Sequence, residues 1–168
     1  MNSSRNVRPS SMNKQVLIEE IRWELSQLKK LAVTAGELAA IPDAKRDPWD
    51  ATAAAKYVSD VFHGVENLWK RRCVFLNMPW PEGPDSHAKI LNDFLATPSL
   101  GGRLIPEIAQ RLRSYKSFRH RFIHGYAFEP VWEMVEEPLH LIPETIEAIA
   151  EIWEHWLEEI ANDSAKEE

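Results

Sequence analysis

The chain has 168 residues, of which 44% are hydrophobic and 27% are charged, with a formal net charge of -6 and a single cysteine. One cysteine excludes an internal disulfide, and Cys73 lies in an apolar helical run, where we expect a buried thiol in a reducing cytoplasm. No segment approaches the roughly 20 apolar residues of a membrane span, and the N-terminus lacks the apolar centre of a signal peptide. Because the overall balance is acidic, any contact with RNA or DNA must be local.

The spacing of apolar residues predicts an all-α protein with one domain at residues 13–162. We expect a disordered tail before it at 1–12 and an acidic tail after it at 163–168. Long helices joined by short connections predict an antiparallel four-helix bundle with an additional short helix. The helices are expected from Lys14 up to the loop at Pro42, at about 51–77, about 86–96 and about 105–124, and from near Pro138 to the acidic tail.

Residues that favour helix ends support these limits. Asp50 is the expected N-cap of the second helix, and Gly125 stands where a C-cap glycine belongs at the end of the fourth. In the last helix, Trp153 and Trp156 belong to a row of isoleucines and tryptophans that are spaced three or four residues apart. This spacing predicts that both tryptophans lie in the core.

Charge is strongly segregated along the chain. Between Arg103 and Arg121 six basic residues accompany Glu107 alone, whereas from Glu129 onward thirteen acidic residues accompany only Lys166. Both segments could be solvated faces whose charges pair between neighbouring helices. The basic segment, however, also contains the residues that are best suited to chemistry.

The fourth predicted helix carries a polar stripe of Arg113, Lys116, His120 and His124 opposite its aromatic face. His120 and His124 are one helical turn apart. Arg119 and His124 are five residues apart, hence about 140° apart around the helix. One small ligand meets both only if the arginine curls round or a second chain contributes, and a dimer would bring two histidines and two arginines into one cleft.

Three interpretations of this cluster are open. A histidine pair at i,i+4 could bind zinc, but the glutamate of a metalloprotease HExxH motif is missing and no further ligand cluster is evident, so we expect no metal. The cluster could be structural, because a charged histidine near a helix C-terminus is favoured by the helix dipole. It could also perform acid–base chemistry on a phosphodiester, since histidine exchanges protons near neutral pH and arginine binds phosphate oxygens.

Residues 119–126 read RHRFIHGY, which contains the string R-x4-H-x-Y late on the penultimate long helix. This motif resembles that of the HEPN superfamily of ribonucleases and, more narrowly, that of the HepT-like toxins of prokaryotic toxin–antitoxin pairs. The likeness extends over roughly residues 50–160. The segment VFHGVENLWKRRC resembles a family segment in which a glycine, a hydrophobic residue and a glutamate follow one another. A Pro-rich loop and a short helix containing His87 come next, in the same order as in the family. A HEPN-like fold is therefore implied.

The resemblance also implies residue roles. Arg119 would hold the scissile phosphate, and His124 would act as general base or acid while the 2′-hydroxyl attacks and a 2′,3′-cyclic phosphate is left. His120 stands where the family commonly has a polar residue, often asparagine, and would assist proton transfer or contact phosphate. Tyr126 would accept AMP from a partner nucleotidyltransferase antitoxin, unless it is only a boundary aromatic residue. Glu66 matches a glutamate of the family, but a solvated or interhelical-paired glutamate is an equal interpretation, and we leave it out of the site.

The leading hypothesis is a metal-independent RNA endonuclease without cofactors, the toxin of a HEPN/nucleotidyltransferase pair, in which Arg113, Lys116 and Arg121 guide the RNA. We expect a cytoplasmic homodimer with a composite active site, and tRNA is the substrate class that the resemblance implies. We prefer RNA over DNA as the substrate because the 2′-hydroxyl of RNA can itself act as the nucleophile, so that the site needs no metal ligands. The alternatives are a non-catalytic HEPN binding module that engages a nucleotidyltransferase or nucleotide, and a structural helical adaptor.

Overall fold

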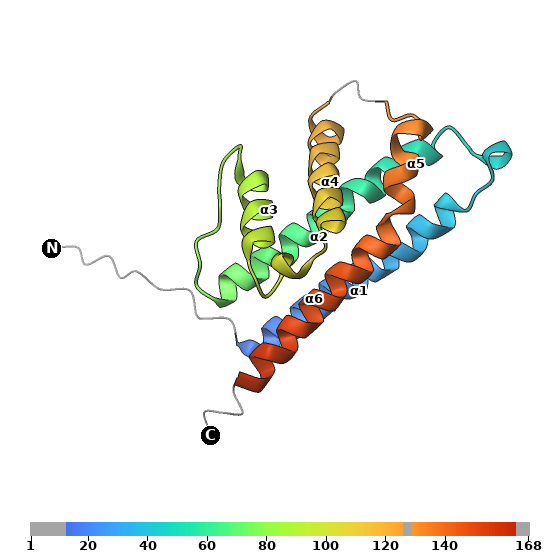
Figure 1. The fold of residues 1–168 in the computed structure, drawn as a ribbon. Helices are drawn as coiled ribbons and strands as arrows, with labels where there is room; N and C mark the ends of the chain where they lie inside the picture. The colour runs from blue at the N-terminus through green and yellow to red at the C-terminus, as the bar shows by residue number, and fades with distance from the viewer. Residues whose placement is uncertain (1–12, 126–128, 164–168) are drawn as a thin grey trace.

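A computed structural model of the chain describes residues 13–125 and 129–163, within which it contains six α-helices and two short 3₁₀ helices (Figure 1). The predicted tail at 1–12, Tyr126, and residues 164–168 of the predicted acidic tail lie outside the described residues. The helices are α1 (Lys14–Ala39), α2 (Asp50–Phe75), α3 (Ser86–Ala96), α4 (Pro106–His124), α5 (Trp132–His140) and α6 (Ile142–Asp163), and the 3₁₀ helices are η1 (Asp43–Lys45) and η2 (Gly101–Arg103).

The predicted all-α fold is confirmed, and the described residues contain no strand. Figure 1 shows α1 running antiparallel to both α2 and α6, while α4 packs on α2. The short helix α3 lies beside α4 and antiparallel to it, so that the first turn of α3 and the last turn of α4 are at the same end of the molecule (Figure 1). This arrangement places the C-terminal part of the polar stripe of α4 next to the start of α3.

The predicted start of the last helix near Pro138 is wrong. Helix α5 already begins at Trp132 and contains Pro138, and the chain ends this helix at His140 before α6 begins. Val135 and Leu139, one turn apart, are fully buried, so packing supports a helix before the proline. The break after His140 is explained by Pro143 in the first turn of α6, because it has no N–H with which to continue the hydrogen bonds of α5 and because proline is favoured at a helix start.

The predicted helix caps are close to the observed ones. Gly125 is the C-cap of α4, and its N–H donates to the carbonyl of Arg121 at 3.0 Å. Asp50 is the first residue of α2 rather than its N-cap, and its carboxylate accepts the N–H of Asp47 at 2.8 Å. An acidic side chain at this end is favoured by the helix dipole.

Helix α2 lies at the centre of the core and is buried along most of its length. Gly64 lets α1 approach closely, because a Cβ atom at this position would lie only 2.5 Å from Cδ2 of Leu28. The buried side chains of α2 include Val58, Val61, Phe62, Val65, Leu68, Trp69 and Cys73. The expectation of a buried Cys73 thiol is therefore confirmed.

Helix α3 is fixed to the core by one aromatic residue. Phe94 is fully buried between Trp69 of α2, at a ring-centroid distance of 6.2 Å, and Trp153 of α6, on which it stacks at 6.3 Å. Gly101 of η2 packs against the backbone of Phe94, where a Cβ atom would come within 2.4 Å of the carbonyl oxygen. These contacts set where α3 lies relative to α4. Trp153 and Trp156 are both buried, as predicted.

Tyr115 connects α4 to α5. Its hydroxyl donates to the carbonyl of Pro138 at 3.0 Å, and its burial raises the pKa of the phenol to about 12. Across residues 13–125 and 129–163, no helix combines the length and the apolar character that crossing a membrane requires.

Candidate active site

A cavity of about 410 Å³ lies where the last turns of α4 face the start of α3. Its volume is within the range of pockets that bind small ligands and could hold a nucleotide-sized group. Basic and histidine side chains dominate the wall that α4 provides, while α2 and the region around the start of α3 close the other sides. The lining residues are Phe62, Pro84, Asp85, His87, Ala88, Lys116, Ser117, Arg119, His120, Arg121, Ile123 and His124.

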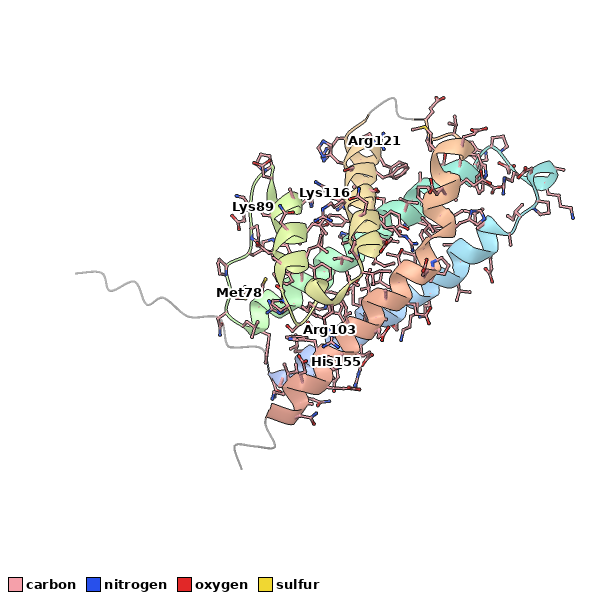
Figure 2. All side chains as sticks on the ribbon, in the orientation of Figure 1. Met78, Lys89, Arg103, Lys116, Arg121 and His155 are labelled. Atoms are coloured by element: carbon pink, nitrogen blue, oxygen red, sulfur yellow. The ribbon has the colours of Figure 1, made fainter. Side chains whose placement is uncertain are left out.

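Most of the predicted site residues of α4 meet at this cavity. Arg119, His120 and His124 line it, and so do Lys116 and Arg121, which are proposed to guide RNA. Figure 2 shows Lys116 and Arg121 on α4, well separated from Arg103 and His155 beside α6. The α4 cavity therefore concentrates positive charge on one side of an acidic protein.

One predicted site residue of the described structure does not line the cavity, and another lies outside the described residues. Arg113 is exposed on α4 and does not line it. Tyr126 lies outside the described residues, two positions after His124 in the sequence.

Arg119 and His124 line the same cavity within one chain, although their spacing separates them by about 140° around an ideal helix. The long side chain of Arg119 extends toward α2, where its Nε lies 3.5 Å from Oε2 of Glu66. The arginine side chain is only 17% exposed. A buried carboxylate on α2 therefore holds the arginine in place at the cavity wall.

Glu66 is buried, with 6% of its surface exposed, and it contacts residues from three helices. Its Oε1 is hydrogen-bonded to Nδ1 of His87 on α3, and Oε2 faces Arg119 on α4. Burial alone would raise the pKa of Glu66, but the contacts with His63 and His87 and the charges of His87 and Arg119 outweigh burial and lower this pKa below its ordinary value. The side chain is therefore a carboxylate at neutral pH.

His63 completes the surroundings of Arg119. Its Nδ1 lies 3.4 Å from an Nη atom of Arg119 and 3.8 Å from Oε2 of Glu66. His63 therefore lies beside both charged groups and helps to hold the Arg119 guanidinium next to Glu66.

The two histidines of α4 lie against each other near the helix C-terminus. The ring centroids of His120 and His124 are 4.9 Å apart, with an interplanar angle of 51°. Both residues are exposed, so solvent or a ligand can reach their ring nitrogens. Among the residues that the structure describes, no three His, Cys, Asp or Glu side chains are grouped so as to hold a metal ion.

The basic segment divides into two groups that the sequence does not separate. Arg103 and Arg111 face α6, where they pair with Glu159 at 3.7 Å and with Glu144 at 2.5 Å. Pairing between neighbouring helices, one interpretation of the segregated charge, is therefore observed for these two arginines. The remaining basic residues of α4 are left at or near the cavity.

Glu66, His63 and His87 are site residues that the sequence prediction left out. The signal for Glu66 was its place one residue after Val65 on the buried stripe of α2, because a charged residue that close to the core needs a partner. His87 had a weaker signal, its place in the short helix after a Pro-rich loop. Only the packing of α3 against α2 shows that Glu66 and His87 meet.

Replacing Glu66 by glutamine should remove a contribution to stability that depends on pH. Because the folded-state pKa of Glu66 lies below its ordinary value of 4.5, the carboxylate stabilises the fold above that pH, and this contribution is lost as the pH falls through the folded-state pKa. The difference in unfolding free energy between wild type and Glu66→Gln, measured by urea denaturation at a series of pH values, should therefore shrink in acid.

Glu154→Gln provides the matched control, since this glutamate is partly exposed in a surface pair with Arg22. Its effect on the free energy of unfolding should be small at every pH. A wild-type advantage over Glu66→Gln that stayed constant through the acid range would contradict the role assigned to the carboxylate.

Comparison with known proteins identifies the family of the chain. Searches of curated proteins and of solved structures found no match. A family model described as HepT-like protein matches residues 53–161, from the first turn of α2 almost to the end of α6. The matched part contains every residue that lines the cavity, together with Glu66 and His63. The chain belongs to the HepT-like family of the HEPN superfamily.

Proposed function

We propose that the chain is an endoribonuclease that cleaves RNA without a metal ion and acts as the toxin of a HEPN/nucleotidyltransferase toxin–antitoxin pair. The observation that carries this proposal is the cavity in which Arg119, held by the buried Glu66, is combined with His120 and His124. Membership of the HepT-like family supports it, because HEPN proteins of this kind are generally related to ribonucleases.

The proposed reaction uses the 2′-hydroxyl of the RNA as nucleophile. His124 takes the proton of this hydroxyl, and the 2′-oxygen attacks the adjacent phosphorus. Arg119 binds the phosphate oxygens and stabilises the charge that develops on them. The bond from phosphorus to the 5′-oxygen breaks, which leaves a 2′,3′-cyclic phosphate and a free 5′-hydroxyl. His120 assists, either by exchanging a proton with His124 or by contacting the phosphate.

The surrounding charges suit a polyanionic substrate. Lys116 and Arg121 add positive charge to the cavity wall, and Arg113 continues the basic surface along α4 beyond it. Each such residue that neutralises a phosphate makes binding weaker at higher salt concentration. In this proposal they orient the RNA, tRNA being the proposed class, and do not take part in the chemistry.

Arg119→Ala and His124→Ala should each lower the rate of RNA cleavage by at least about 10²-fold, the usual scale for loss of an acid–base or charge-stabilising group. The measurement is cleavage of total RNA by purified protein in excess chelator. Arg22→Ala and His155→Ala are matched controls, because both side chains are in exposed pairs on α1 and α6 and do not line the cavity.

The controls should cleave RNA at the wild-type rate. Cleavage by His124→Ala at that same rate would refute the assignment of His124. Absence of cleavage by wild-type protein that carries no AMP would favour a HEPN binding module instead.

We further propose that two copies of the chain form a homodimer whose cavities join into one active site. An apolar groove between α2 and α4 adjoins the cavity, and Ile123 lines both. Trp49 and Ile123 in this groove are 77% and 52% exposed, so a second copy would have large apolar side chains to cover here. A second copy covering this face would bring a second Arg119 and His124 to the same cleft.

Mixing two inactive variants tests the composite site. In a mixed dimer of Arg119→Ala and His124→Ala protomers, one intact arginine and one intact histidine remain in the shared cleft. We therefore expect cleavage to return in part after the two variants are unfolded together and refolded, while each variant refolded alone stays inactive. A refolded mixture as inactive as its components would indicate that the site is not shared between protomers.

The proposed neutralising step is attachment of AMP to Tyr126 by a partner nucleotidyltransferase antitoxin. Tyr126 follows His124 by two residues, so an adenylyl phosphate there would compete by charge and bulk with the substrate phosphate. The acidic α6 is the proposed surface for a basic patch of this partner.

Incubation with the cognate nucleotidyltransferase and ATP should increase the intact mass by one adenylyl group and abolish cleavage. Tyr126→Phe should gain no mass and keep its cleavage activity, whereas Tyr57→Phe, a control on α2, should be modified as the wild type is. Full modification of Tyr126→Phe would assign the acceptor to another residue.

A further inference from the structure

We propose that His87 is a second proton-transfer residue of this site, a general acid that protonates the leaving 5′-oxygen, and that Glu66 is the positioning residue that orients its ring. The inference rests on the proposed ribonuclease function and goes beyond its R-x4-H residues. Its basis is the hydrogen bond between His87 and Glu66, together with the place of His87 on the wall of the cavity that Arg119 and His124 also line.

The contact with Glu66 fixes which ring nitrogen of His87 can meet a substrate. An ionised carboxylate only accepts hydrogen bonds, so Nδ1 of His87 must carry a hydrogen and donate it to Oε1 of Glu66. Nε2 is then the nitrogen that remains for the cavity. The side chain of His87 is 43% exposed, whereas that of Glu66 is 7% exposed, so the histidine reaches the cavity and the carboxylate stays behind it.

The ring is also held against movement. Phe62 of α2, another lining residue, contacts it edge-on at a centroid distance of 6.4 Å. Helix α3, which carries His87 in its first turn, is fixed to the core through Phe94 between Trp69 and Trp153. The ring of His87 is therefore held by a buried carboxylate and an aromatic edge, on a helix that is fixed to the core. This preorganises it for proton transfer, whereas a solvated surface histidine is free to turn.

The reaction needs one proton removed and another supplied, at different oxygens. His124 accepts the proton of the 2′-hydroxyl while the bond from the 2′-oxygen to phosphorus forms. As the bond from phosphorus to the 5′-oxygen breaks, this oxygen takes the proton from Nε2 of His87. His87 enters this step as the imidazolium, paired with the Glu66 carboxylate, and leaves it neutral, and exchange with solvent restores both histidines.

A single carboxylate thereby organises two functions of the site. Glu66 accepts the Nδ1 hydrogen of His87 through one oxygen and faces Nε of Arg119 with the other. The phosphate-binding residue and the proton donor come from different helices, and the common contact sets their relative position. His120 and His124 are both exposed at the end of α4, and no hydrogen bond between their rings and a carboxylate is seen among the described residues. His87 is therefore the best oriented histidine of the cavity.

The test uses a substrate whose leaving group needs no proton. An RNA oligonucleotide that the wild-type protein cleaves is compared with the same oligonucleotide in which sulfur replaces the 5′-oxygen at the cleaved bond, because a thiolate leaves without general-acid assistance. His87→Ala should lower cleavage of the ordinary RNA by about 10²-fold or more and cleave the sulfur substrate at close to the wild-type rate. His124→Ala should lose cleavage of both substrates, since the 2′-hydroxyl still requires a base.

His87→Asn is the second variant, because its amide can still donate to Glu66 but cannot supply a proton. It should reproduce the pattern of His87→Ala, and His155→Ala should cleave both substrates as the wild type does. Wild-type cleavage of ordinary RNA by both His87 variants, or an equal loss on the two substrates, would overturn the role of His87 while the function of the chain stands. A wild-type protein that cleaves neither substrate would instead contradict the proposed function, and this inference with it.

Discussion

The carboxylate of Glu66 is buried where three helices meet, and the geometry of the cavity depends on how its charge is compensated. Burying an ion costs several kcal/mol unless partners and hydrogen bonds offset the loss of water. Here the partners are Arg119 on α4 and His87 on α3, with His63 one turn away on α2 itself. Because these contacts, taken together, lower the pKa of Glu66 despite its burial, the ionised form is the one that the fold favours.

The fold provides this meeting point by fixing each helix elsewhere. Gly64 allows α1 to pack closely on α2, so α2 is covered on one side and presents Glu66 on the other. Phe94 fixes α3, and the hydrogen bond from Tyr115 to the carbonyl of Pro138 connects α4 with α5. None of these residues touches the cavity, yet each limits how far its helix can move from Glu66. Rigid elements of this kind hold site residues more precisely than loops do.

Sequence periodicity was sufficient for the all-α fold, the buried tryptophans of α6 and the basic wall of the cavity, since each of these follows from residues on one helix. It failed at Pro138, where burial of Val135 and Leu139 extends a helix on both sides of a residue that normally limits one. It also left out Glu66 and His87, which are 21 positions apart. A contact between helices depends on how far apart and at what angle they pack, and a single sequence does not carry that information in its local spacing.

The same packing explains how a chain with a net charge of -6 can present a cavity with a locally positive wall. Glu144 and Glu159 on α6 pair with Arg111 and Arg103, so part of the acidic helix is opposed by the basic residues nearest to it. Lys116, Arg119 and Arg121 line the cavity together with a single acid, Asp85, and the buried Glu66 beside it is already shared between Arg119 and His87. Exposed charges farther away than about a Debye length, roughly 8 Å at physiological ionic strength, are screened. The local excess of positive charge, rather than the net charge of the chain, therefore determines what the cavity attracts.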